Sequence, residues 1–118
     1  MPRYMALIYL DESRFADATP EDGMQMAKAY QVYTEETQAA GIFQSGDGLQ
    51  PSSTATTVRV RDGQVLTTDG PFAETKEALG GFYVFTCKDL DEAIEWAARI
   101  PGAAAGSIEV RPVIDYEG

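Results

Sequence analysis

The segment DGPFAETKE, residues 69–77, places three acids and a lysine beside a strong turn signal. A carboxylate such as Asp69, when partly withdrawn from water, has a raised pKa and can act as a general acid or base. Asp, Gly and Pro are also the preferred residues of tight turns, with Phe72 then anchoring the loop in the core. Both interpretations stay open. Lys76 either points inward to fix an anionic ligand, oriented by Glu74, or belongs to a solvated loop of opposite charges.

Arginines on two predicted strands are the best candidates for ligand binding. Arg59, Arg61 and Arg111 alternate with valines. If Arg59 and Arg111 face one interior, their guanidinium groups form a clamp for a carboxylate or phosphate. The alternative is cross-strand pairing with Glu109 or Glu74, and the sequence does not decide between the two.

Tyrosines supply the remaining candidate contacts. Tyr9 and Tyr83 lie on predicted strands, where their rings either stack on an organic ligand or pack in the core. The predicted ligand-binding residues are therefore Arg59, Lys76, Arg111, Glu74, Tyr9 and Tyr83, with Asp69 as the candidate catalytic residue.

Composition excludes several classes of function. The 118 residues form a single predicted domain, 1–118, with a net charge of −10 from 19 acids and 9 bases. This charge argues against nucleic acid and anionic membranes as partners. Histidine is absent, and Cys87 is the only cysteine, so we expect no metal site and no cofactor. A single cysteine cannot form an intrachain disulfide, which fits a cytoplasmic protein.

Short-range signals define the elements that must position these residues. Apolar runs predict strands at 4–10, 80–87 and 107–114. Thr19-Pro20 begins one helix and Gly41 ends it, and Asp89 begins a second helix. Asp62-Gly63 predicts a two-residue hairpin turn.

The order of elements, which is strand, helix, two or three strands, helix and strand, predicts a fold class. A split β-α-β arrangement with an antiparallel sheet and both helices on one face is a ferredoxin-like α+β fold. Two helices cover only one face of such a sheet. We therefore predict a homodimer in which the uncovered faces pack together and enclose a barrel-like interior.

A family resemblance agrees with this prediction. The string TDGPFAETKEALGGFYV resembles the signature of the DGPF group within the YCII-related domain family, and YMALIYLDE, AGIFQSGDGLQP, TTVRVRDG, DLDEAIEWAARIP and IEVRPV resemble other segments in order. The resemblance implies a ferredoxin-like fold that dimerises as an α+β barrel, in small bacterial proteins of undefined activity. It equates Asp69 with a family aspartate. The histidine that accompanies this aspartate in much of the wider family has no counterpart here.

Three functional hypotheses follow. The first is a cytoplasmic dimer that holds a small organic ligand between its sheets, an anionic one if the arginines line the cavity. The second is an enzyme in which Asp69 acts as general acid or base in a proton transfer, elimination or isomerisation. The third is an interaction module for a sigma-factor-type transcription protein, since the resemblance implies such an association.

Overall fold

The structure is a computed structural model that describes residues 1–116. Within this range the chain forms two α-helices, six β-strands and three short 3₁₀ helices. In chain order these are β1 (Arg3–Leu10), η1 (Glu12–Phe15), α1 (Pro20–Ala39), β2 (Phe43–Gly48), η2 (Ser52–Thr54), β3 (Thr56–Arg61), β4 (Gln64–Asp69), β5 (Ala78–Thr86), α2 (Leu90–Ala98), η3 (Pro101–Ala104) and β6 (Ser107–Pro112).

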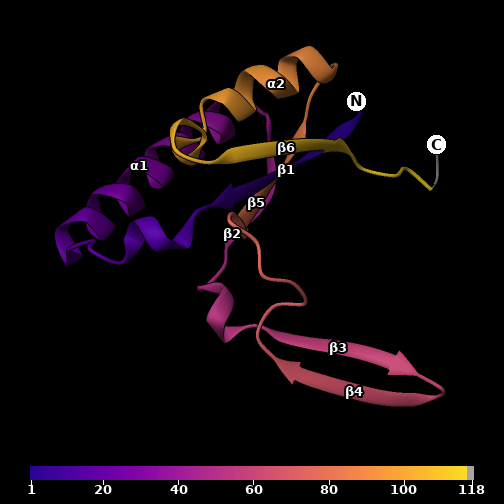
Figure 1. Ribbon diagram of the computed structural model, residues 1–118. Coiled ribbons are helices and arrows are strands. Elements are labelled where there is room, and N and C mark those ends of the chain that lie inside the picture. Colours follow the sequence, from indigo (N-terminus) through magenta and orange to yellow (C-terminus); the bar gives the residue numbers. More distant parts are fainter. Residues whose placement is uncertain (117–118) are drawn as a thin grey trace.

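Four strands form the main sheet in the order β2-β5-β1-β6, with every neighbouring pair antiparallel. Both helices lie on the same side of this sheet (Figure 1). The predicted α+β class with two helices and antiparallel strands is confirmed. The strand order is compatible with the ferredoxin-like arrangement. Among residues 1–116, neither helix combines the length and the apolar character that a membrane crossing requires.

Both helices begin where the sequence predicts, because their first amide groups find side-chain acceptors. The Asp22 backbone N–H donates to Thr19 Oγ1 at 3.1 Å and the Thr19 N–H donates to Asp22 Oδ2 at 3.0 Å, a complete capping box. At α2, the Glu92 N–H donates to Asp89 Oδ1 at 2.9 Å. These bonds satisfy amides that have no partner within the helix.

The hydrophobic core fills the space between the sheet and the helices. Alternate residues of β1, namely Tyr4, Ala6 and Ile8, point into it and are buried. Phe85 of β5 is fully buried, with 0% of its surface exposed, and is opposite Tyr4 in the antiparallel register. The main core cluster therefore lies on the helix side of the sheet, and Val84 of β5, opposite Met5, is a further buried residue on the other side.

The other face of the sheet carries no helix and is called the open face below. It presents the odd-numbered residues of β1 and their partners on β5, which are apolar at the centre. On β6, Glu109 is opposite Leu7 and Arg111 is opposite Met5, so both charged residues belong to this face. The apolar side chains of the open face are Met5, Leu7, Tyr9, Leu79, Phe82 and Val84.

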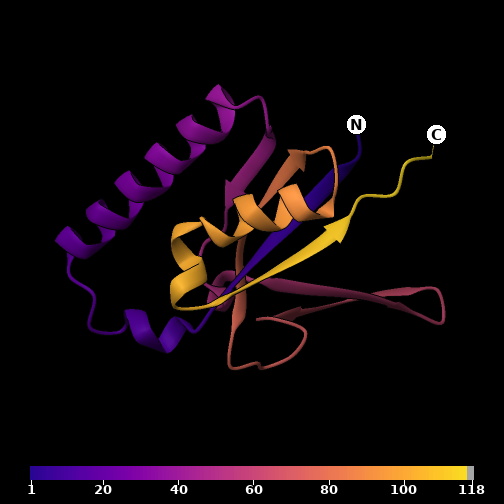
Figure 2. The same ribbon diagram turned by 90° about the horizontal axis from the view of Figure 1, so that it is seen from above.

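Strands β3 and β4 form a hairpin that pairs only with itself and projects from the body; residues 56–69 are called the arm. Asp62 and Gly63 turn the chain with φ of 52° and 76°, which confirms the predicted two-residue turn. The arm lies on the side of the sheet opposite the helices, as Figures 1 and 2 show together. It makes the radius of gyration 16.3 Å, against about 13–14 Å for a compact domain of this length.

Candidate functional site

A cavity of about 590 Å³ lies where the arm joins the body. One wall is the DGPFAETKE segment, which contributes residues 71–75 and 77, and the opposite wall comes from residues 49–52 and 54–57. Tyr9 on the open face, Glu12 just after β1, and Ala78 and Leu79 at the start of β5 complete the lining. The most distinctive sequence motif of the chain therefore lines a cavity.

Hydrogen bonds across the base of the arm hold this wall in place. The Gly70 N–H donates to the Ala55 carbonyl at 2.7 Å, and Thr57 Oγ1 donates to the Gly70 carbonyl at 2.8 Å. Gly70 has a φ of +100°, which a residue with a side chain adopts only with strain. The structural interpretation of the motif as a turn is thus confirmed at this glycine.

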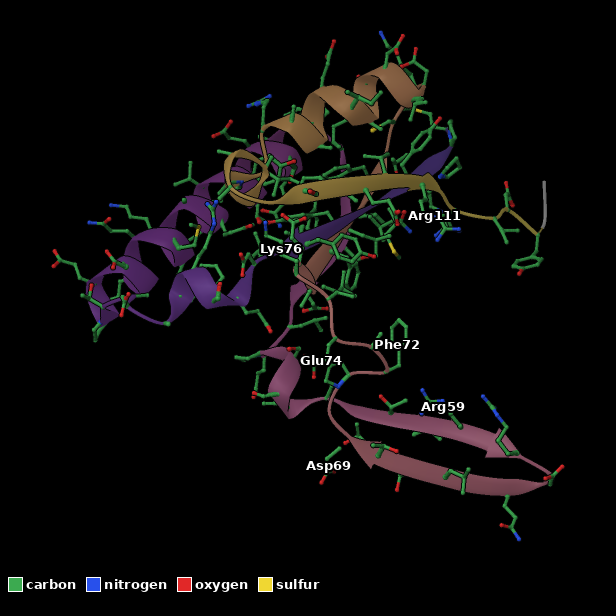
Figure 3. All side chains as sticks on the ribbon, viewed as in Figure 1. Arg59, Asp69, Phe72, Glu74, Lys76 and Arg111 are labelled. Atoms are coloured by element: carbon green, nitrogen blue, oxygen red, sulfur yellow. The ribbon has the colours of Figure 1, made fainter. Side chains whose placement is uncertain are left out.

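Phe72, in contrast, does not anchor the loop in the core, and that prediction is wrong. Its side chain is 79% exposed and borders the cavity. The reason is geometric: the core lies on the helix side of the sheet, while the loop that carries Phe72 emerges on the side of the arm (Figure 3).

A carboxylate ties the body to the foot of the arm. Glu12 Oε2 accepts a hydrogen bond from the Ser52 backbone N–H at 2.7 Å, and Glu12 Oε1 accepts one from Ser52 Oγ. These two bonds lower the pKa of Glu12 against the opposing effect of desolvation, because both favour the ionised form. Sequence reasoning missed this residue. The only signal was an acidic pair, Asp11-Glu12, placed directly after a buried strand.

The charged groups that line the cavity are all carboxylates. Glu12, Glu74 and Glu77 belong to it, whereas no lysine or arginine of the described chain does. Glu77 Oε1 accepts a hydrogen bond from Ser107 Oγ at 2.8 Å. Within residues 1–116, no group of three His, Cys, Asp or Glu side chains is placed to hold a metal ion.

Lys76 lies outside the cavity lining. Of the two alternatives for this residue, its position fits the solvated loop and not the inward-pointing lysine. It is exposed, and its charge reaches Asp11 instead. Hydrogen bonds from Ser13 are the main cause of the lowered pKa of Asp11, and the charge of Lys76 adds a smaller effect. Glu74 does line the cavity.

Arg59 lies at the outer rim. It follows Thr57, a lining residue, on the same face of β3, about 7 Å further along the arm. Figure 3 shows Arg59 and Phe72 on the same side of the arm, with Arg111 apart from both on β6. The single chain therefore forms no Arg59–Arg111 clamp. Nor does either arginine pair with Glu109 or Glu74 in the part of the chain that is described.

Asp69 occupies the opposite face of the arm. It is paired with Thr56 at the end of β4, and it shares its face with Val58. Its carboxylate is exposed and points away from the side that carries Arg59 (Figure 3). The partial burial expected for an acid or base is absent from the single chain.

Tyr9 and Tyr83 are separated by the sheet. Tyr9 lines the cavity on the open face. Tyr83 is buried on the helix side, stacked on Phe85 at 5.7 Å and hydrogen-bonded to Thr34 at 2.9 Å. It also lines a separate cavity of about 380 Å³ beside α1. Of the seven candidates from the sequence, the structure brings Tyr9 and Glu74 together in one cavity, with Arg59 at its rim.

Fold and cavity together define a small α+β domain. Its DGPFAETKE segment lines a cavity beside the face of the sheet that carries no helix (Figure 1). The chain belongs to the YCII-related domain family, whose model matches residues 2–117. It is 36% identical over 116 residues to an uncharacterized protein of Rhizobium meliloti (strain 1021), covering 97% of this chain and 94% of that protein. The name of that relative assigns no activity, so the roles of individual residues rest on geometry.

Proposed function

We propose that this protein is a homodimer that binds a small organic molecule in the cavity at the foot of the arm. The observation that carries the proposal is the position of the DGPFAETKE segment, which lines this cavity with six of its residues. A volume of about 590 Å³ falls within the range of ordinary ligand sites, about 300–1,000 Å³.

The lining suggests the chemistry of the ligand. Leu49, Pro71 and Phe72 offer an apolar surface, and glutamate carboxylates offer hydrogen-bond acceptors. Glu12 and Glu77 already accept bonds from serines, so Glu74 is the acceptor best placed to receive a donor from the ligand. The ligand then has an apolar body and a hydroxyl, amide or amine group near Glu74. An anionic group, where the ligand carries one, is best accommodated at the rim near Arg59.

The dimer is supported by the open face. Its apolar centre carries no helix in the single chain (Figure 1): Val84 is buried there, Leu79 is exposed, and the other apolar side chains are partly exposed. Apolar surface left partly exposed in this way marks interaction sites. Two-fold packing of open faces hides the patch on both copies at once. It produces the ferredoxin-like, barrel-shaped dimer expected from the family resemblance. In such a dimer each cavity, which includes Tyr9 of the open face, adjoins the second copy.

A thermal-shift screen tests the ligand site. The library contains small amines, alcohols, carboxylates and aromatic acids, and is run on wild type, Glu74→Gln and Arg59→Ala, with Glu95→Gln as a matched control. Glu95 is exposed on α2 and lies outside the cavity. A ligand at one hundred times its Kd stabilises the folded state by about 2.7 kcal/mol, which is a visible shift.

We expect a hit whose shift is lost in Glu74→Gln and kept in Glu95→Gln. Loss in Arg59→Ala identifies an anionic group on the ligand. A hit unaffected by Glu74→Gln contradicts the site. No hit from any class, with every variant folded, contradicts ligand binding and favours the interaction module with a transcription protein.

A further inference from the structure

The cavity of about 380 Å³ beside α1, called the helix-side cavity below, lies between that helix and strands β2 and β5. It shares no lining residue with the cavity at the foot of the arm. Its walls include the apolar side chains of Ile8 and Leu10, and the rings of Phe43 and Tyr83, which meet edge to face at 6.2 Å. Its volume lies within the range of small-molecule sites, about 300–1,000 Å³.

Missing side chains on two neighbouring strands open this cavity. Gly48 of β2 is directly opposite Gly81 of β5, and Gly81 is opposite Ile8, whose side chain points to the helices. Both glycines therefore leave bare backbone on the helix side of the sheet. Packing explains Gly81, because a Cβ at this position would lie only 2.8 Å from the carbonyl oxygen of Asp47.

Packing does not explain Gly48. A Cβ at this position meets no heavy atom of the described chain within 4 Å, and its φ is not positive. Glycine in a strand usually marks a bulge, a bend, or the close approach of another backbone or of a ligand. The irregularity in the pairing of β2 lies elsewhere, between Phe43 and Ser45, and no other backbone comes near Gly48. Space for a ligand is the explanation that remains.

Three hydroxyl-bearing side chains line the same cavity. Tyr30 Oη accepts a hydrogen bond from the Gly102 N–H at 3.1 Å, so its own proton is still available. Thr34 Oγ1 and Tyr83 Oη share one hydrogen bond at 2.9 Å, which uses one of their two protons. Neither remaining proton has an acceptor among residues 1–116. Burial raises the pKa of both tyrosines, so they stay protonated and serve as donors at neutral pH.

The helix-side cavity offers no charge to a ligand. Asp47 belongs to its lining, but it is opposite Phe82 in the pairing register, so its carboxylate is on the open face. No other acidic or basic residue of the described chain lines the cavity. An ionised ligand would lose its hydration without gaining a counter-charge, which favours a neutral one.

We propose that the helix-side cavity is a second binding site, for a small neutral molecule with a flat apolar body and one or two carbonyl oxygens. The body lies over the bare backbone at Gly48 and Gly81. The carbonyl oxygens accept hydrogen bonds from Tyr30 and from the Thr34–Tyr83 pair. This site does not depend on the one at the foot of the arm, whose ligand donates to Glu74.

Titrations of the full chain followed by ¹H–¹⁵N NMR test the site and its chemistry. The probes are 1-tetralone and chromone, which are bicyclic carbonyl compounds, and tetralin, which has the ring system of 1-tetralone without the oxygen. We expect saturable binding of a carbonyl probe, with shifted amides at 30–34, 43–48 and 80–83. Tetralin should bind about tenfold more weakly, the effect of about one hydrogen bond. If neither carbonyl probe binds, or if the shifted amides lie elsewhere, the proposal is overturned.

Two variants test the named residues. Gly48→Leu fills open space, so it should melt no lower than wild type and bind the carbonyl probes at least about tenfold more weakly. Gly23→Leu is its matched control, because a Cβ at Gly23 also meets nothing within 4 Å and Gly23 lies outside the cavity lining. Tyr30→Phe should weaken 1-tetralone about tenfold and leave tetralin unchanged, while Tyr116→Phe, at a residue that is 90% exposed, changes neither.

Unchanged affinity for 1-tetralone in Tyr30→Phe contradicts the assigned donor, and unchanged affinity in both variants overturns the site. If Gly48→Leu does not fold, Tyr30→Phe decides by the difference between 1-tetralone and tetralin. The ligand site at the foot of the arm is judged separately, by the loss of the thermal shift in Glu74→Gln, so the two proposals can fail independently.

Discussion

The stability effects of two phenylalanine substitutions should distinguish a residue of the hydrophobic core from a residue of the candidate site. Phe85 has 0% of its surface exposed and Phe72 has 79% exposed. A phenylalanine that buries about 200 Å² gains about 5 kcal/mol at 25 cal/mol per Å². On the same scale the buried fifth of Phe72 is worth about 1 kcal/mol. We therefore expect Phe85→Ala to lower the free energy of unfolding by about 3–5 kcal/mol, and Phe72→Ala to lower it by about 1 kcal/mol at most.

Chemical denaturation followed by circular dichroism measures both changes in the free energy of unfolding. The measurement is repeated at several protein concentrations. Phe85→Ala should have the same large effect at every protein concentration. Phe72→Ala should have its small effect at the lowest concentration and a larger one as dimers form, because Phe72 lies between the arm and the open face. An equal loss for both variants in dilute protein would refute this reasoning and make Phe72 a core anchor.

Two further predictions concern titratable groups. Hydrogen bonds from Ser52 lower the pKa of Glu12 below its ordinary value of 4.5, so the ionised carboxylate stabilises the folded state above pH 4.5 and this contribution is lost as the pH falls through the lowered pKa. Below pH 4.5 the melting temperature should therefore drop more steeply with falling pH for wild type than for Glu12→Gln. Equal slopes for the two proteins would show that Glu12 does not contribute to the pH dependence of stability. Burial, aided by the charges of Glu92 and Asp89, raises the pKa of Cys87 to about 11. Iodoacetamide at pH 8 should then alkylate the native protein only at the rate of unfolding, and alkylation as fast as in denatured protein contradicts an inert, buried thiol.

The carboxylate-rich lining changes the search for a ligand. Sequence reasoning emphasised arginines and an anionic ligand, because placed cations are conspicuous in an acidic chain. In the folded chain, Arg59 is outside the cavity lining, and the charged groups within the lining are glutamates. Hydrogen-bond donors therefore belong in the first library beside acids.

Local signals in the sequence determined the elements. Caps at Thr19 and Asp89, the Asp62-Gly63 turn and the Gly70 turn each depend on a few neighbouring residues, and the structure confirms all four. The order of these elements was enough to predict an α+β fold with an antiparallel sheet and both helices on one face.

Tertiary structure alone decided which face each strand residue occupies. In β1 both alternating sets are apolar, Met5-Leu7-Tyr9 and Tyr4-Ala6-Ile8, so alternation cannot say which set meets the helices. A difference of one position reverses the face of a side chain, which is why Tyr9 and Tyr83 were grouped from the sequence and lie on opposite sides of the sheet. Phe72 has no periodic neighbours at all. Its place beside the cavity depends on where the arm leaves the sheet, and that is fixed by strand pairing between residues far apart in the chain.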